Sequence, residues 1–102
     1  MFIVLLKFSD NKAKAAEHMA GHNAWLQRGF EDGVFLLAGG IKPGQGGVVL
    51  AEGGSLDELQ QRVAEDPFVA EDVVTAEILD IQAARADERL QFLLDVAGEG
   101  AA

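Results

Sequence analysis

The pattern of apolar and polar positions divides the chain into short strands and longer helical segments. Residues 2–8, FIVLLKF, are β-branched and aromatic and end at SDN, which is typical of a strand followed by a helix start. A helix is expected from Asp10 as N-cap, with Asn11 as the alternative, to about Asp32, where Gly33 closes it. Its apolar stripe, at helical spacing, consists of Ala15, Met19, Leu26 and Phe30.

Strand patterns return three more times. Residues 34–40 and 48–52 predict two strands that form a hairpin around the glycine-rich segment between them, and residues 73–81 predict a fourth strand. With a second helix before the fourth strand, the order is β-α-β-β-α-β. This order predicts an α+β, ferredoxin-like fold with an antiparallel four-stranded sheet and both helices on one face.

The second helix has a clear start and stop. Ser55 and Glu58 have the S-x-x-E spacing of a capping box. The helix is expected to finish near Asp66, because Pro67 keeps the residue before it out of the α region.

The tail from residue 83 onwards carries a further apolar pattern. Leu90, Leu93, Leu94 and Ala97 recur at helical spacing, and GEGAA then predicts a frayed end. We therefore expect one domain over residues 1–82 and a C-terminal helical extension over residues 83–102.

Both faces of the predicted sheet are apolar. In the first strand the even-numbered residues point one way and Ile3 and Leu5 the other, whereas a solvated face would alternate with polar residues. In the fourth strand Leu79 and Ile81 likewise lie opposite Ile78. Two helices cover one face, so the sequence predicts a homodimer packed sheet to sheet; in the alternative, the C-terminal helix covers part of that face in a monomer.

Composition narrows the possible partners. The 102 residues carry a formal charge of −9, so the average field repels nucleic acid and anionic membranes, and neither is expected as a partner. The chain has no cysteine, which removes disulfides, thiolate metal sites and cysteine nucleophiles. The short apolar run at the N-terminus has neither a basic segment before it nor a cleavage pattern after it, so a cytoplasmic protein is expected.

His22 is the first candidate for chemistry. It lies beside the predicted apolar stripe, next to Gly21, and a glycine inside a helix often marks the close approach of another backbone or a ligand. The simple interpretation is a boundary histidine that hydrogen-bonds a carbonyl group. The sharper interpretation needs a partner, and Asp66 is the candidate because it is held extended before Pro67.

A metal site is a further alternative. His18 and His22 are four residues apart, the spacing at which two imidazoles on one helix face can share an ion. A third ligand would have to be Glu17 or Asp66, and the sequence has no H-E-x-x-H motif. We therefore assign no metal and no cofactor.

The glycine-rich segment GGIKPGQGG lies between two strands, so no helix N-terminus follows it to hold a phosphate. Gly39 and Gly40 leave space, and they would form the floor of a pocket beside His22.

A helix histidine, followed by LLAGG and then by EDPFV, resembles the YCII-related (YciI-like) family over residues 1 to about 82. The resemblance implies a ferredoxin-like dimer of the α+β barrel type, with His22 and Asp66 paired in a small pocket. The chain departs from the family in two places: Gly40 stands where proline is frequent, and the tail beyond Gln82 is an addition that would place an extra helix over the pocket or the dimer seam.

An imidazole oriented by a carboxylate can take and give a proton near neutral pH. With this pair, the resemblance predicts a cofactor-free enzyme of lyase or isomerase type that acts on a small carbonyl or ring compound. Trp25, Phe35 and Phe68 are expected to line its pocket. The alternatives are a non-catalytic dimer that binds a small metabolite or serves as an accessory protein, and a cofactor-free oxygenase.

Overall fold

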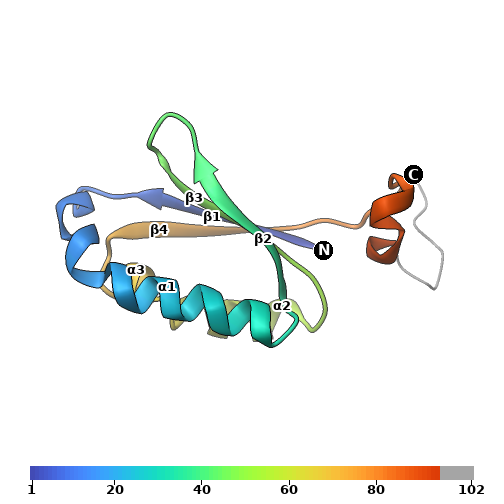
Figure 1. Ribbon diagram of the computed structural model, residues 1–102, viewed down its shortest axis with the longest axis horizontal. Coiled ribbons are helices and arrows are strands. Elements are labelled where there is room, and N and C mark those ends of the chain that lie inside the picture. Colours follow the sequence, from blue (N-terminus) through green and yellow to red (C-terminus); the bar gives the residue numbers. More distant parts are fainter. Residues whose placement is uncertain (95–102) are drawn as a thin grey trace.

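The structure, a computed structural model, describes residues 1–94, and Figure 1 shows a sheet with helices on one side. The order of elements confirms the predicted α+β, ferredoxin-like arrangement, with short extra helices around the two longer ones. In chain order they are β1 (Phe2–Phe8), η1 (Lys12–Lys14), α1 (Ala15–Glu31), β2 (Phe35–Ile41), β3 (Gly46–Ala51), α2 (Leu56–Ala64), α3 (Pro67–Ala70), β4 (Val74–Asp80) and η2 (Glu88–Leu93).

The four strands form one antiparallel sheet in the order β2-β3-β1-β4. Strand β1 is central, and its Val4 pairs with Val49 of β3 on one side and with Ile78 of β4 on the other. A register shift between Phe35 and Leu37 interrupts the β2–β3 pairing. The observed strands begin and end within two residues of the predicted ones.

The hydrophobic core fills the layer between the sheet and the helices. Phe2, Val4 and Leu6 of β1 are buried in it and Phe8 packs against it, so the even-numbered side chains of β1 share one face. Trp25 closes the layer from the helix side. The buried apolar residues are Phe2, Val4, Leu6, Trp25, Phe35, Val49, Ala51, Leu59, Val63, Phe68, Val73 and Val74.

Helix α1 begins later than predicted. A 3₁₀ turn, η1, precedes it, so Asp10 caps nothing, and Asn11 takes the N-cap position of that turn without a side-chain capping bond. The Oγ of Ser9 instead accepts a hydrogen bond from the backbone N–H of Asn11. The predicted end is right, since Asp32 is the C-cap and Gly33 follows with φ +74°.

The buried face of α1 is rotated from the predicted stripe. Met19 and Phe30 are 42% and 44% exposed, whereas Trp25 and Gly29 are buried. The buried face is set by contacts with other elements. The Trp25 indole N–H donates to the carbonyl of Arg62 in α2. A count of apolar residues misses such contacts.

Helix α2 begins as predicted and ends earlier. Ser55 and Glu58 form the capping box, and the last helical residue is Ala64. Asp66 is extended and starts a separate helix, α3, which the sequence did not predict. Proline is favoured at the first position of a helix, so Pro67 both ends one helix and begins the next.

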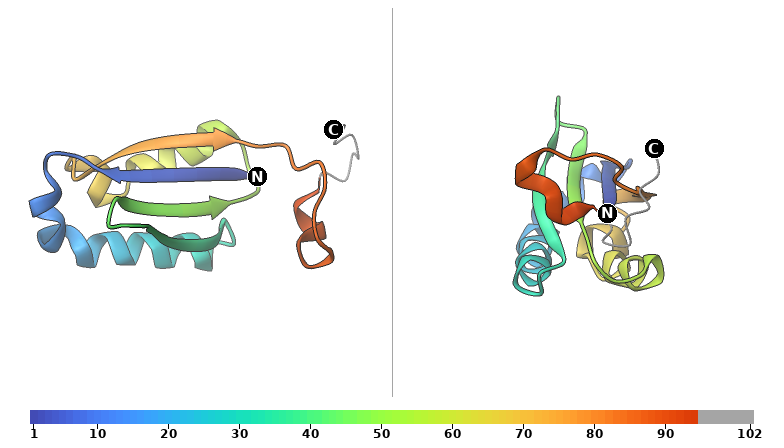
Figure 2. Two further views of the ribbon diagram at one scale, coloured as in Figure 1. Left: turned by 90° about the horizontal axis from the view of Figure 1, so that it is seen from above. Right: turned by 90° about the vertical axis from the view of Figure 1, so that its right-hand side faces the viewer.

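The second face of the sheet is uncovered by the described residues, as the view from above in Figure 2 shows. Apolar side chains from all four strands lie on it. Ile3 and Leu5 are half-buried, and Leu37 and Leu79 are 50% and 38% exposed.

The C-terminal segment leads away from the end of β4 and covers neither face of the sheet in its described part (Figures 1 and 2). It forms the 3₁₀ segment η2 with a kink at Leu90. Leu90 and Phe92 are 46% and 55% exposed. The expected positions of Ala97 and of the frayed end lie outside the described residues. Within residues 1–94, no helix is long and apolar enough to cross a membrane.

Candidate functional site

His22 and Asp66, far apart in sequence, meet between α1 and the start of α3. The His22 Nδ1 lies 2.8 Å from the Asp66 Oδ1, and the two side chains are 14% and 0% exposed. Asp66 caps α3, because the same Oδ1 accepts a hydrogen bond of 3.0 Å from the backbone N–H of Phe68. The carboxylate is thus fixed by α3 and contacts the imidazole.

Aromatic stacking fixes the plane of the His22 ring. The Phe68 ring lies parallel to it, with an angle of 4° between the planes and 4.1 Å between the centroids. An imidazole that donates Nδ1–H to a carboxylate has Nε2 as its remaining acceptor. None of the residues 1–94 hydrogen-bonds that Nε2, so this nitrogen is available to a ligand.

The second oxygen of Asp66 is unusual. Oδ2 is buried and has no hydrogen-bond partner among residues 1–94. A buried carboxylate is costly unless it is paired. Asp66 therefore depends on His22 and on the backbone of Phe68, both acting at Oδ1, for its stabilisation.

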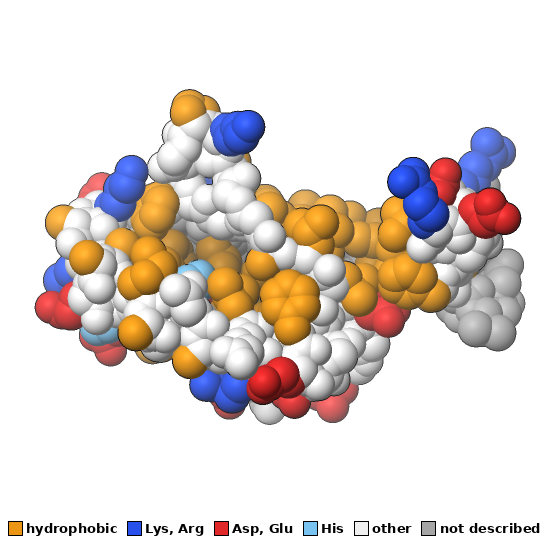
Figure 3. Space-filling model, in the orientation of Figure 1, with side chains coloured by type: hydrophobic (Ala, Val, Ile, Leu, Met, Phe, Trp, Pro, Cys, Tyr) orange, Lys and Arg blue, Asp and Glu red, His pale blue; other side chains and the backbone are white. Residues whose placement is uncertain are grey.

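His22 faces two adjoining cavities of about 220 and 200 Å³, and Leu6, His22 and Gly47 line both of them. Figure 3 shows the surface hollowed between the raised β2–β3 hairpin and α1, with mostly hydrophobic side chains around it. His22 and Asn23 supply the polar side chains of the lining. The first cavity is also lined by Leu26, Ala38, Gly39, Val48 and Val49, and the second by Phe8, Met19, Asn23, Gly46, Phe68 and Val74.

The predicted pocket residues divide into two groups. Gly39 and Phe68 line the cavities beside His22. Trp25, Phe35 and Gly40 do not line these two cavities. Trp25 and Phe35 are core residues, with ring centroids 5.0 Å apart. The rotation of α1 turns Trp25 into the core, where it meets Phe35 of β2.

Sequence reasoning missed several lining residues. Phe8 and Val74 are paired neighbours on β1 and β4, and only the strand register brings them to the cavity. Met19 was assigned to the core. Asn23 directly follows His22, and its polar side chain beside an apolar helix face is the sequence feature that could have indicated its place in the lining.

No third ligand joins His18 and His22 at the metal site considered as an alternative, as far as the structure describes the chain. The Nε2 of His18 lies 3.1 Å from Oε2 of Glu17, the preceding residue. Across the described part of the chain, no three metal-ligating side chains come together.

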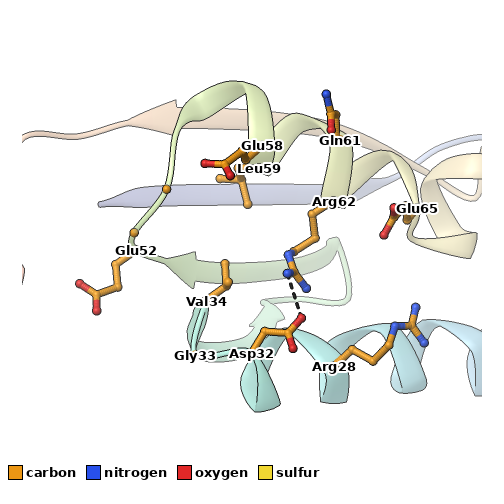
Figure 4. A pocket seen from close by; sticks show the side chains of 12 residues that line it. Arg28, Asp32, Gly33, Val34, Glu52, Glu58, Leu59, Gln61, Arg62 and Glu65 are labelled. Carbon is orange, nitrogen blue, oxygen red and sulfur yellow. Dashed lines mark hydrogen bonds and ion pairs between the residues drawn. The ribbon is translucent and has the colours of Figure 1, made fainter.

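A larger cavity of about 580 Å³ lies elsewhere, between the C-terminal end of α1 and α2 (Figure 4). Charged side chains line it, and Arg62 forms an ion pair of 2.9 Å with Asp32 across it. Arg28, Glu58 and Glu65 are exposed there. The cavities at His22 are smaller, but the hydrogen bond to the fully buried Asp66 and the stacking on Phe68 hold His22 in a fixed geometry, which makes them the better candidate site.

The sequence of residues 1–82 matches the YCII-related domain. The chain belongs to this family. No curated protein matches its sequence.

A solved structure of similar fold is 5-chloro-2-hydroxyhydroquinone dehydrochlorinase (TftG) from Burkholderia phenoliruptrix AC1100, in complex with 2,5-dihydroxybenzoquinone. The TM-score is 0.66 at 17% identity, and the match covers 85% of this chain and 100% of the dehydrochlorinase. At this identity the similarity shows the fold.

Proposed function

We propose that this YCII-related protein is a small cofactor-free enzyme of lyase or isomerase type, with His22 as the general acid/base and Asp66 as the residue that orients it. The observation that carries the proposal is the 2.8 Å contact between Nδ1 of His22 and the fully buried Asp66, at the edge of an apolar cavity that His22 lines. The polar atom that faces the cavity is then Nε2 of the imidazole, and the hydrogen bond of Nδ1 to Asp66 fixes the tautomer of the ring.

The chemistry follows from that orientation. Nε2 takes a proton from a carbon next to a carbonyl or from a hydroxyl group of the substrate, and the electron pair left behind forms a new double bond. In an elimination, that pair expels a leaving group such as halide; in an isomerisation, the imidazolium returns the proton to another atom. Asp66 stabilises the imidazolium between the two steps.

The lining indicates the substrate class. Phe68 and Val74 present apolar surface, and Asn23 adds one amide beside the histidine. Cavities of about 200 Å³ each fit a single ring compound better than a nucleotide or a peptide. The bound quinone and the dehydrochlorination named for the structural neighbour support a hydroxylated, halogenated ring as the first substrate to test.

We further propose that the protein is a homodimer packed through the open sheet face. Leu37 and Leu79, on β2 and β4, are large exposed apolar residues on that face, where burial in an interface is the usual outcome. Analytical ultracentrifugation of Leu37→Glu is expected to show monomers. Leu90→Glu, in the tail at similar exposure, is the matched control and should remain dimeric; a dimeric Leu37→Glu variant would contradict this assembly.

Turnover tests the catalytic role. Purified protein is incubated with 5-chloro-2-hydroxyhydroquinone and with other halogenated hydroquinones, and chloride release and quinone absorbance are followed. His22→Gln is expected to lower kcat by about 10² to 10⁴-fold, the usual contribution of a general acid/base. His18→Gln, on the same helix, is the control and should keep the wild-type rate.

The other outcomes decide between the rival functions. A folded His22→Gln variant with full turnover would exclude the acid/base role. If the compound is bound and recovered unchanged, the non-catalytic binding function is favoured. Oxygen uptake during turnover would instead indicate a cofactor-free oxygenase.

A further inference from the structure

We infer that Gly21 is a positioning residue: its contact with Pro67 sets the distance between His22 and Asp66. This inference rests on the proposed function and extends it to a residue that does not touch the cavity. A Cβ atom placed on Gly21 would lie 2.9 Å from Cγ and 3.6 Å from Cβ of Pro67. Helix α1 can therefore approach α3 this closely only because residue 21 has no side chain.

The backbone offers no other reason for a glycine here. Gly21 lies inside α1, and it is not among the residues with positive φ. Glycine in a helix interior costs about 1 kcal/mol relative to alanine. The close approach to Pro67 is the feature of the described structure that explains why a glycine occurs here despite this cost.

The contact is adjacent to both members of the pair. Gly21 precedes His22 on α1, and Pro67 follows Asp66 at the start of α3. The distance between the two helices at this point therefore also determines the 2.8 Å contact of Nδ1 with Oδ1 and the parallel stacking of His22 on Phe68 at 4.1 Å.

The size of the effect follows from contact distances. Carbon atoms in favourable contact are about 3.5–4.0 Å apart, so an alanine at position 21 has to move α1 and α3 apart by about 0.6 Å or more from the 2.9 Å approach. The hydrogen bond between His22 and Asp66 would lengthen from 2.8 Å toward the limit of about 3.2 Å for N–H···O bonds and beyond it.

Nuclear magnetic resonance of the His22 ring tests the inference without any substrate. In the wild type, the proton on Nδ1 is expected to exchange slowly, and the ¹⁵N shifts should show Nδ1 protonated and Nε2 bare at a pH where the ring is neutral. Gly21→Ala should lose the slowly exchanging proton. Ala20→Gly, at an exposed position beside it, is the control for helix propensity and should keep this proton.

A second variant isolates the contact itself. Pro67→Ala removes the Cγ atom that residue 21 would meet, and it also removes the ring that favours the extended conformation of Asp66. Pro67→Ala alone, which should keep the signal of the proton on Nδ1, is therefore the reference, and the double variant Gly21→Ala/Pro67→Ala should recover that signal. Wild-type signals in Gly21→Ala, or their loss in both the single and the double variant, would overturn the inference. If Gly21→Ala does not fold but the double variant does, the contact is equally supported; if neither folds, it is refuted.

Turnover provides the functional readout. Gly21→Ala should reduce kcat by about tenfold to a hundredfold with KM little changed, as expected when a catalytic group is misplaced by less than 1 Å, and the double variant should restore it. The ring signals test the contact even if no substrate is turned over, so a failure of the proposed function leaves a distinct result.

Discussion

Asp66→Ala is expected to destabilise the protein by about 3 kcal/mol. The substitution removes the N-cap of α3, which is worth about 1 kcal/mol. That cap is the bond from the buried N–H of Phe68, so the further loss is the acceptor of the Nδ1–H of His22. A buried group left without a partner costs about 1–3 kcal/mol. Removal of the unpartnered Oδ2 atom offsets part of this loss.

The consequence is large for a domain of this size. Native domains are stable by about 5–15 kcal/mol, and 1 kcal/mol shifts Tm by about 4–8 °C in a domain of up to 100 residues. Asp66→Ala should thus lower Tm by roughly 12–24 °C. Asp66→Asn keeps an oxygen acceptor for both donors and should cost about 1 kcal/mol.

Urea unfolding followed by tryptophan fluorescence measures these values. Trp25 is the single tryptophan of the chain and is fully buried, so its emission reports global unfolding. Glu65→Ala is the control, because it removes the exposed carboxylate of the residue that precedes Asp66. It should change the free energy of unfolding by less than about 0.5 kcal/mol. An Asp66→Ala variant within 1 kcal/mol of the wild type, or an Asn variant as unstable as the Ala variant, would refute the reasoning.

Three further predictions concern other parts of the chain. Gly29→Ala should destabilise the protein by about 2–3 kcal/mol in urea unfolding, because its Cβ would lie within 2.2 Å of two Phe35 ring carbons; a neutral result would show that the ring can move away. Deletion of residues 83–102 should leave Tm within a few degrees of the wild type, whereas a large drop would show that the tail belongs to the domain. Hydrogen bonds from Arg89, first from its backbone and second from its side chain, hold the pKa of Asp87 below its usual value. This local turn is therefore stabilised at pH values above the lowered pKa and loses the contribution as the pH falls through it. An NMR titration in which Arg89→Ala does not raise the pKa of Asp87 would contradict this.

The location of the pair was accessible from sequence because local rules act there. Pro67 fixes Asp66 in an extended conformation whatever the surroundings, and His22 stands out as a histidine beside a helix glycine. Local rules did not indicate that Trp25 is a core residue. Which face of α1 is buried depends on contacts with residues far along the chain, such as that of Trp25 with Arg62.

By itself, the sequence determined the order of the four strands and the two long helices, the capping box at Ser55, the end of α1 at Gly33 and the two residues proposed for chemistry. Spacing, capping and backbone preference act over a few residues. Only the tertiary structure decided that Nδ1 of His22 lies 2.8 Å from Asp66, that the cavity lies beside them, and that α1 is turned to bury Gly29. These features depend on how closely separate elements approach. That approach is set by steric contacts such as Gly21 with Pro67, whose partners no local pattern identifies.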